Sequence, residues 1–463
     1  MRRNIDMIND RLSTSIIRYT IPIILTGLLQ LLFNAADLVI VGRFCGSICV
    51  AAVSATGAIT NLIVNLFIGL SVGASVTVAH SLGGRNDEET HRTVHTAFAT
   101  ALTGGVILTI IGVVFSRYFL IWMNTPDNVL PLSTVYMRIY FGGIIFSMIY
   151  NFCASILRAS GDSKTPLVYL TVSGVINVVL NVIFVTVFHM NVDGVALATT
   201  LSQGVAAVLV TRALMKRTDA CRLILKKVRF YKKQLLKIIR IGLPAGIQGS
   251  MFSISNVIIQ SSVNSFNSDA IMSGNGAASN LEGFVFVVMN SLHQTAVNYI
   301  GQNAGAHRFD RIKKIYVTCL GYVAIAGAAA SLSILLFGRQ LLSVYITDSQ
   351  EAIGYGLVRL TYVMLPYFLC GLMDVSTGAL RGLGSSFVPM VITVLGVRGI
   401  RIAWIYTIFQ IPQYHTPECL YLSYFISWAT TFIVQTVAFT IVYKKKASAD
   451  RLWLSQQNTR RVL

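Results

Sequence analysis

LRASGDSKTP at residues 157–166 and LRGLGSSFVP at residues 380–389 are two copies of one pattern, with leucine, arginine, glycine, serine and proline at matching places. Two prolines upstream of these segments, Pro22 and Pro244, have nearly the same separation along the chain. A chain that repeats itself at such a distance consists of two similar halves. The repeat therefore predicts a fold of two lobes related by internal pseudo-symmetry.

The composition places both halves in a membrane. The chain has 463 residues, of which 54% are hydrophobic and only 12% charged, and its mean hydropathy is +0.67. A soluble protein carries roughly 25% charged residues, and a helix of about 20 apolar residues crosses a bilayer. We predict an all-α membrane protein with twelve transmembrane helices, at residues 16–41, 50–80, 93–116, 130–157, 166–189, 193–215, 236–262, 275–303, 315–338, 354–381, 387–410 and 420–443.

These spans divide into two pseudo-symmetric lobes of six helices. Because six is an even number, both lobes enter the membrane in the same direction. We expect Pro22 and Pro244 to bend the first span of each lobe. The predicted divisions are an N-terminal lobe at 1–215, a basic cytoplasmic linker at 216–235, a C-terminal lobe at 236–443 and a cytoplasmic tail at 444–463.

The distribution of positive charge predicts the orientation. The net charge is +19, and most of the lysines and arginines fall in the two tails and the even-numbered connections. Cytoplasmic loops of membrane proteins carry such an excess. We therefore predict a multi-pass protein of the cytoplasmic (inner) membrane with both termini in the cytoplasm. A basic loop beside the inner leaflet accounts for the charge, so no nucleic-acid partner is expected.

Several kinds of site have no motif in the sequence. The seven cysteines show no CxxC spacing, the seven histidines form no HExxH pattern, and no GxxxxGK[ST] phosphate loop occurs. We therefore expect no cofactor and no resident metal. No nucleophile is paired with a base in the spans, so an intramembrane enzyme is disfavoured and we predict no enzymatic activity.

Eight segments in order resemble motifs of one family. They are QLLFNAADLVIVGRF (30–44), SLGGRN (81–86), LRASGDSKTPL (157–167), GVINVVLNVIF (174–184), GVALATTLSQ (194–203), GLPAGIQ (242–248), GQNAGAHRFDR (301–311) and GALRGLGSSFVP (378–389). In these segments the chain resembles the multidrug and toxic compound extrusion (MATE) transporters of bacteria. The resemblance implies a two-lobe, twelve-helix antiporter that exports organic, often cationic, compounds against an inward flow of H⁺ or Na⁺.

Polar side chains on two N-terminal spans predict a site for the coupling cation. Gln30, Asn34 and Asp37 share one face of the first span, and Asn177 and Asn181 share a face of the fifth. A carboxylate with neutral oxygens suits Na⁺, bound transiently, or a relayed proton. The resemblance also implies a cation site at Asp37, but family members often have aspartate where this chain has Asn181. A purely structural Asp37 is the alternative.

Glu282 on the eighth span predicts a site for the cargo. It shares a helix face with Phe286 and Met289, and a carboxylate beside such side chains suits a lipophilic cation. Gln248 and Asn256 on the seventh span would form the opposite wall. For Phe286 and Met289, core packing is the competing interpretation.

Asp374 and several arginines, among them Arg359, Arg398 and Arg401, also fall within spans of the C-terminal lobe. Asp374 is a possible second acidic site, with a structural or gating role as the alternative. Arg359 lies near an end of its span, and we expect its side chain to reach the membrane surface. If so, the charged side chains that stay deep within the membrane spans are mainly acidic.

We therefore predict a cation-coupled antiporter that exports amphipathic organic cations or drugs and works as a monomer within the lipid bilayer. A lipid-linked oligosaccharide flippase of the same exporter superfamily is the alternative, although it would need a cationic central cavity. A channel is disfavoured by the duplicated lobes. The sequence does not distinguish H⁺ from Na⁺.

The predicted orientation can be tested by cysteine labelling. In Lys226→Cys, an impermeant maleimide should label the new cysteine only after cells are permeabilised. Asp127→Cys, in a predicted external loop, is the matched control and should be labelled in intact cells. Labelling of position 226 from outside intact cells, above the level of the parent protein, would overturn the orientation.

Overall fold

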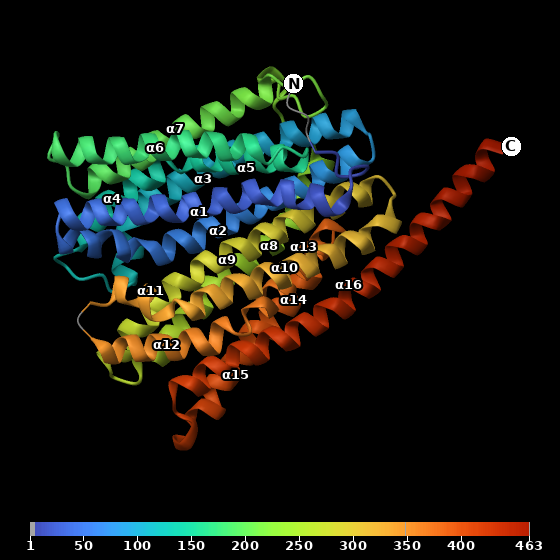
Figure 1. Cartoon of the computed structure of the whole chain (residues 1–463). Helices are drawn as coiled ribbons and strands as arrows, with labels where there is room; N and C mark the ends of the chain where they lie inside the picture. The colour runs from blue at the N-terminus through green and yellow to red at the C-terminus, as the bar shows by residue number, and fades with distance from the viewer. Residues whose placement is uncertain (1–4, 348, 463) are drawn as a thin grey trace. The chain divides into compact units, whose positions relative to one another are not determined.

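The computed structural model describes residues 5–347 and 349–462 and consists of helices joined mostly by short turns, with a longer segment between residues 215 and 232 (Figure 1). By length and composition, eight of the described helices could each cross a membrane. Two further pairs qualify when each pair is taken as one bent span. Each of the twelve predicted spans falls on one of these helices or pairs, or on one of the more polar helices α8 and α9.

The helices of the first half follow one another with short connections. They are α1 (Leu12–Phe44), α2 (Ser47–Gly83), α3 (Asp87–Trp122), α4 (Leu130–Gly142), α5 (Ile144–Ala159), α6 (Lys164–Thr186) and α7 (Val192–Met215), which is followed by the 3₁₀ turn Leu225–Lys227.

The second half repeats this order with more interruptions. Its α-helices are α8 (Lys232–Asn264), α9 (Asp269–Gly305), α10 (Phe309–Leu336), α11 (Gly338–Tyr345), α12 (Gln350–Met364), α13 (Tyr367–Gly382), α14 (Phe387–Thr393), α15 (Ile400–Tyr406) and α16 (Pro417–Val462). A π-helical segment, Val394–Gly399, joins α14 to α15, and two 3₁₀ turns, Ile408–Gln410 and Pro412–Tyr414, precede α16. The sequence did not predict α11 or the π-helix.

The two bent spans lie at matching places in the repeat. The α4–α5 pair breaks at Gly143 and the α12–α13 pair at Leu365 and Pro366, with a bend of 44° in each. Pro366 explains the second break, because proline lacks the N–H of a helical hydrogen bond and disfavours helix at the preceding residue. The separation of Gly143 and Leu365 along the chain equals that of Pro22 and Pro244.

Neither Pro22 nor Pro244 interrupts its helix, since α1 and α8 both continue through the proline. The hydroxyl of Thr26 donates a 2.7 Å hydrogen bond to the Pro22 carbonyl one turn back. Serine and threonine side chains of this kind satisfy backbone groups close to a helical proline.

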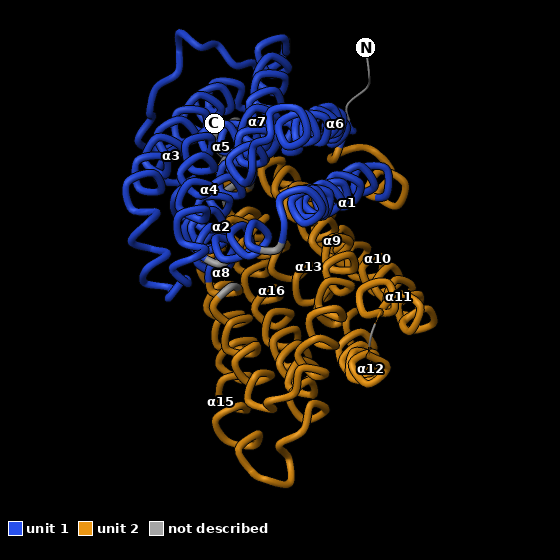
Figure 2. The backbone as a smooth tube through the Cα atoms, turned by 90° about the vertical axis from the view of Figure 1, so that its left-hand side faces the viewer, with its two compact units in different colours: residues 1–6, 17–250 blue, residues 7–16, 251–463 orange. Residues whose placement is uncertain are grey.

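The chain forms two compact units (Figure 2). Unit 1 contains residues 1–6 and 17–250, and unit 2 contains residues 7–16 and 251–463. Helices α1 and α8 each have residues in both units. The exact division into lobes, linker and tail stays a prediction.

Close helix contact within unit 1 depends on glycine. Gly69 and Gly73 of α2 face Gly242 and Gly246 of α8, and a Cβ atom on any of the four would collide with backbone of the other helix. Small residues four apart allow such close approach in membranes, where van der Waals packing helps to hold helices together.

In unit 2 the N-terminal segment is fixed to the second half of the chain. The side chain of Asn303 donates to the Met7 carbonyl at 3.0 Å, and Arg311 donates to the Asp10 carbonyl at 2.8 Å. At the other end of the chain, α16 extends past the neighbouring helices of its unit (Figure 1). The tail predicted from residue 444 continues this helix without a break.

Candidate functional site

The predicted cation residues of α1 and α6 meet inside unit 1. The amide nitrogen of Asn181 donates to Asp37 Oδ1 at 2.5 Å and also lies 3.4 Å from Asn177 Oδ1. Asn177 in turn donates to the Thr199 hydroxyl of α7 at 3.3 Å. Asn181 is fully buried, whereas Asp37 is partly exposed.

One oxygen of this cluster has no partner. Asn181 Oδ1 is buried and accepts no hydrogen bond from the described residues. A buried acceptor without a donor is costly, because the group has lost its water. An acceptor oxygen beside a carboxylate is the kind of group that a cation binds.

The other two predicted residues on α1 lie apart from the cluster. Gln30 and Asn34 have exposed side chains, and no described hydrogen bond links them to Asp37. The sequence reading missed Thr199 and also Tyr136, which interacts electrostatically with Asp37. Thr199 lies in the GVALATTLSQ segment, but only folding shows which of its polar residues faces α6.

In unit 2, Glu282 is paired with Arg359. Arg359 Nε donates to Glu282 Oε1 at 2.6 Å and Nη2 donates to Oε2 at 2.9 Å, a bidentate pair. Arg359 Nη1 donates to Asn275, whose oxygen also accepts from the Tyr421 hydroxyl at 3.1 Å. The arginine is 4% exposed, so the expectation that it reaches the membrane surface is wrong. The carboxylate on α9 holds it inside.

The two apolar residues that the sequence placed beside Glu282 both make packing contacts, Met289 in the core and Phe286 in a half-buried position. Met289 is fully buried and packs against Gly327 and Gly371, as the core-packing interpretation proposes. The ring of Phe286 stacks on Phe252 with centroids 6.0 Å apart.

The expected opposite wall is split between the two units. Gln248 belongs to unit 1 and is buried, whereas Asn256 belongs to unit 2 and is exposed. Their placement opposite Glu282 stays a prediction.

Asp374 lies among cations. It interacts electrostatically with Arg381 and Arg398, and its backbone carbonyl lies 2.7 Å from Nδ1 of His293. Nε2 of the same histidine lies 3.3 Å from Arg381 Nη1. No described ion pair of the usual length joins Asp374 to either arginine.

A fourth buried arginine, Arg401, lies against aromatic rings. Its guanidinium carbon is 3.8 Å from the ring centre of Tyr424 and 5.4 Å from that of Trp428. Nε donates to Ser427 at 3.0 Å, and Nη2 has no hydrogen-bond partner among the described residues. Arg401 closely follows the π-helix, a distortion that is frequent at functional sites.

The deep charges of unit 2 are therefore not mainly acidic, contrary to our expectation. The carboxylates Glu282 and Asp374 accompany four arginines that are each 6% exposed or less: Arg359, Arg381, Arg398 and Arg401. The sequence placed arginines in these spans, but it could not show that their side chains turn inward.

Comparison with known proteins gives the family. The sequence profile of MatE matches residues 22–183 and 244–407. The two matches start at Pro22 and Pro244, the prolines that mark the internal repeat. The chain belongs to the MatE family. The resemblance to MATE transporters is thus confirmed, and the protein is a multi-pass membrane transporter, not a classical enzyme, of a family that needs no cofactor.

Individual relatives match over most of their length. The chain is 29% identical to the probable multidrug resistance protein YoeA of Bacillus subtilis, covering 92% of this chain and 93% of that protein. It is 28% identical to the probable multidrug resistance protein YpnP of the same organism, over 82% and 84% of the two chains.

A solved structure has the same fold. It is an outward-facing multidrug resistance MATE family transporter of the MOP superfamily, which superposes with a TM-score of 0.90 at 20% identity, over 97% of this chain and 99% of that one. This likeness confirms the all-α fold of twelve transmembrane helices in two lobes.

The Glu282–Arg359 pair makes a testable prediction about stability. Removing one partner leaves a buried charge, so Glu282→Gln and Arg359→Met should each lower the free energy of unfolding by about 3–5 kcal/mol. The double variant should lose clearly less free energy of unfolding than the two single variants lose together, because no charge is then left unpaired. Denaturant unfolding in detergent measures this.

Glu351→Gln, an exposed acid on the same helix as Arg359, is the control. It should change the free energy of unfolding by at most about 0.5 kcal/mol. Strictly additive losses for the Glu282 and Arg359 variants would show that the pair does not stabilise the fold as a unit.

Proposed function

We propose that this MatE transporter is an antiporter that exports small organic compounds across the cytoplasmic membrane, driven by inward flow of H⁺ or Na⁺. We also propose that both termini are cytoplasmic and that the working form is a monomer. The observation that carries the coupling step is the contact between Asp37 and Asn181, with the unpartnered Asn181 oxygen beside it.

The chemistry of this cluster suits a cation more than any other ligand. It offers one carboxylate, two amide oxygens and a threonine hydroxyl, from Asp37, Asn177, Asn181 and Thr199. Oxygen ligands of this kind bind hard cations. An entering cation would neutralise Asp37 and could bind the Asn181 oxygen. It would thus compensate both the carboxylate charge within the span and the buried oxygen that lacks a donor.

The absence of a second acid in the cluster bears on the choice of ion. Asn181 cannot accept and release a proton as an aspartate would, so a relay between two carboxylates is not available there. A proton would have to reside on Asp37 alone, whereas Na⁺ could use the neutral oxygens as well. Measuring efflux from proteoliposomes under an imposed Na⁺ or H⁺ gradient, separately, distinguishes the two ions.

Replacing Asp37 tests the coupling site. Asp37→Asn keeps the shape of the side chain but removes the charge that would hold the cation, so gradient-driven efflux should fall at least about tenfold. Insertion and folding should be retained. Asp127→Asn, at an exposed acid between α3 and α4, is the matched control and should transport normally. Unchanged efflux in Asp37→Asn would move the ion site elsewhere.

Asn181 gives a finer test of the same site. Asn181→Ala removes the neutral oxygen and should weaken the dependence of efflux on the driving ion. Asn181→Asp should move the pH profile of efflux, because two adjacent carboxylates repel and retain a proton more readily than one. Indifference of the ion dependence to both changes would reduce α6 to a packing element.

The cargo is a separate question. Relatives named as multidrug resistance proteins support export of small organic compounds. The sequence favoured amphipathic cations, with Glu282 as their partner. In the structure a cation would have to displace Arg359 from that carboxylate. A second candidate is a cargo with an anionic group, favoured by the excess of buried arginines and by the unpartnered Nη2 of Arg401.

Matched dyes decide between the two kinds of cargo. The experiment measures the affinities of purified wild type, Glu282→Gln and Arg401→Gln for cationic, neutral and anionic dyes of similar size. If the cargo is cationic, Glu282→Gln should weaken binding of the cationic dye and leave binding of the other two dyes unchanged. If Arg401→Gln instead weakens binding of the anionic dye alone, the second candidate is supported. Equal changes for all three dyes would make both residues structural.

A further inference from the structure

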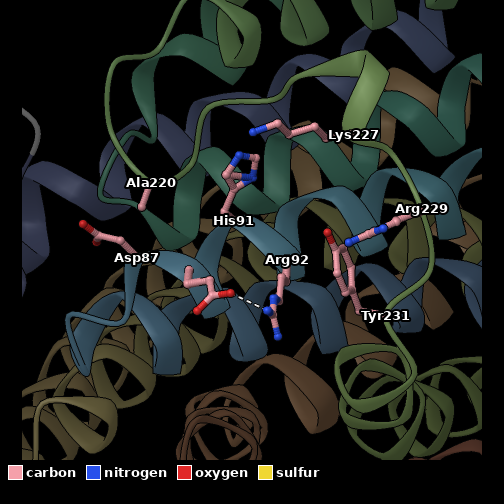
Figure 3. Close-up of a pocket in the computed structure, with 8 residues that line it drawn as sticks. Asp87, His91, Arg92, Ala220, Lys227, Arg229 and Tyr231 are labelled. Carbon is pink, nitrogen blue, oxygen red and sulfur yellow. Dashed lines mark hydrogen bonds and ion pairs between the residues drawn. The ribbon is translucent and has the colours of Figure 1, made fainter.

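A cavity of about 400 Å³ lies in unit 1, away from the deep charges, between the start of α3 and the segment that follows α7 (Figure 3). The predicted third span begins at residue 93, so the cavity lies at the boundary between membrane and water. Its lining residues are Asp87, Glu88, His91, Arg92, Ala220, Lys227, Arg229 and Tyr231.

The segment that covers the cavity is anchored to α3 and to the core. The Ile224 N–H donates to Nε2 of His95 at 3.0 Å, and the Tyr231 N–H donates to the Thr96 hydroxyl at 3.2 Å. Cys221 and Leu223 are buried in the hydrophobic core of unit 1. The cationic side chains of this segment are therefore carried on a fixed backbone, which lowers the entropic cost of binding.

Three cations converge on this cavity. The guanidinium carbons of Arg92 and Arg229 lie 5.5 and 4.6 Å from the centre of the same ring, Tyr231. Lys227 interacts electrostatically with His91, and Figure 3 shows the two side chains close together. Such like charges repel one another unless an anion lies between them.

The nearby acids do not fully balance these cations. Glu88 pairs with Arg92, and Glu89 pairs with Lys237 of α8 at 2.5 Å. Figure 3 shows Asp87 on the opposite side of His91 from Arg229, with its carboxylate directed away. No ion pair joins Lys227 or Arg229 to a carboxylate of the described residues.

We propose that this cavity binds a phosphate ester. Arginine offers a planar fork that matches phosphate oxygens, and lysine adds a mobile point charge. Arg229 and Lys227 approach the cavity from one segment, and the Tyr231 ring holds the two guanidiniums beside it. The phosphate belongs either to an anionic lipid of the adjacent leaflet or to a soluble compound, and both present negatively charged phosphate-ester oxygens.

The two sources are separated by offering each one alone. Purified full-length protein in neutral detergent would be titrated with phosphatidylglycerol, with phosphatidylcholine as the zwitterionic control, and followed by native mass spectrometry. In a parallel arm, calorimetry would measure binding of glycerol 3-phosphate. Saturable binding in the lipid arm alone assigns the site to a headgroup, and saturable binding of glycerol 3-phosphate assigns it to a soluble ligand.

Paired charge variants test the location of the site. Lys227→Gln/Arg229→Gln should weaken binding of the phosphate ligand by about tenfold or more, because charge-assisted hydrogen bonds are lost. Lys226→Gln/Arg222→Gln removes two exposed cations of the same segment that do not line the cavity. This control has the same net charge and should bind within about twofold of wild type.

Thermal unfolding without ligand checks that both double variants fold, which is expected because all four side chains are exposed. Arg229→Lys keeps the charge but loses the fork, so its binding should be intermediate. Equal binding by the two double variants, or no saturable binding of either phosphate ligand by wild type, would overturn the proposal. These readouts do not involve transport, so they are independent of the proposed antiport.

Discussion

A charged side chain within a membrane-spanning helix needs protein atoms in place of water, because a lone charge at the bilayer centre costs about 2.5–3.5 kcal/mol or more. The two units meet this constraint differently. In unit 1, Asp37 is contacted by the neutral amide of Asn181. In unit 2, Glu282 is contacted by the full positive charge of Arg359, which Asn275 also holds. The packing of α9 and α12 is therefore fixed by electrostatics as well as by apolar contact.

The two halves share a helical scaffold but differ in the charged side chains of their interiors. The bent spans lie at equivalent places, and the two MatE matches start at equivalent prolines. Apart from Arg381, whose counterpart is Arg158, the deep charges do not follow the repeat. At the separation of the two prolines, Asp37 corresponds to Ile259, Glu282 to Thr60 and Arg359 to Met137. Duplication thus supplied two similar bundles, and substitution at single inward positions gave each one a different interior.

Sequence reasoning found the helices well and the side-chain partners poorly. Twenty-residue apolar runs and the repeat suffice to place twelve spans. Helical spacing also put Asp37 on one face of α1 and Asn181 on one face of α6, but only tertiary packing brings those faces together. Arg359 shows the limit most clearly, because an arginine near a helix end can extend to the membrane surface or turn inward to an acid. That choice depends on Glu282, 77 residues earlier.

The different interiors of the two units suggest different roles for them in the proposed antiport. Binding of a cation at Asp37 would neutralise that carboxylate, whereas the carboxylate of Glu282 already faces the positive charge of Arg359. The driving ion would then change the electrostatics of unit 1 alone. Helix α1 carries Asp37, yet its first residues, Leu12 to Ile16, belong to unit 2. A shift of α1 on ion binding would therefore displace residues of both units, because the helix runs from Leu12 to Phe44 without a break.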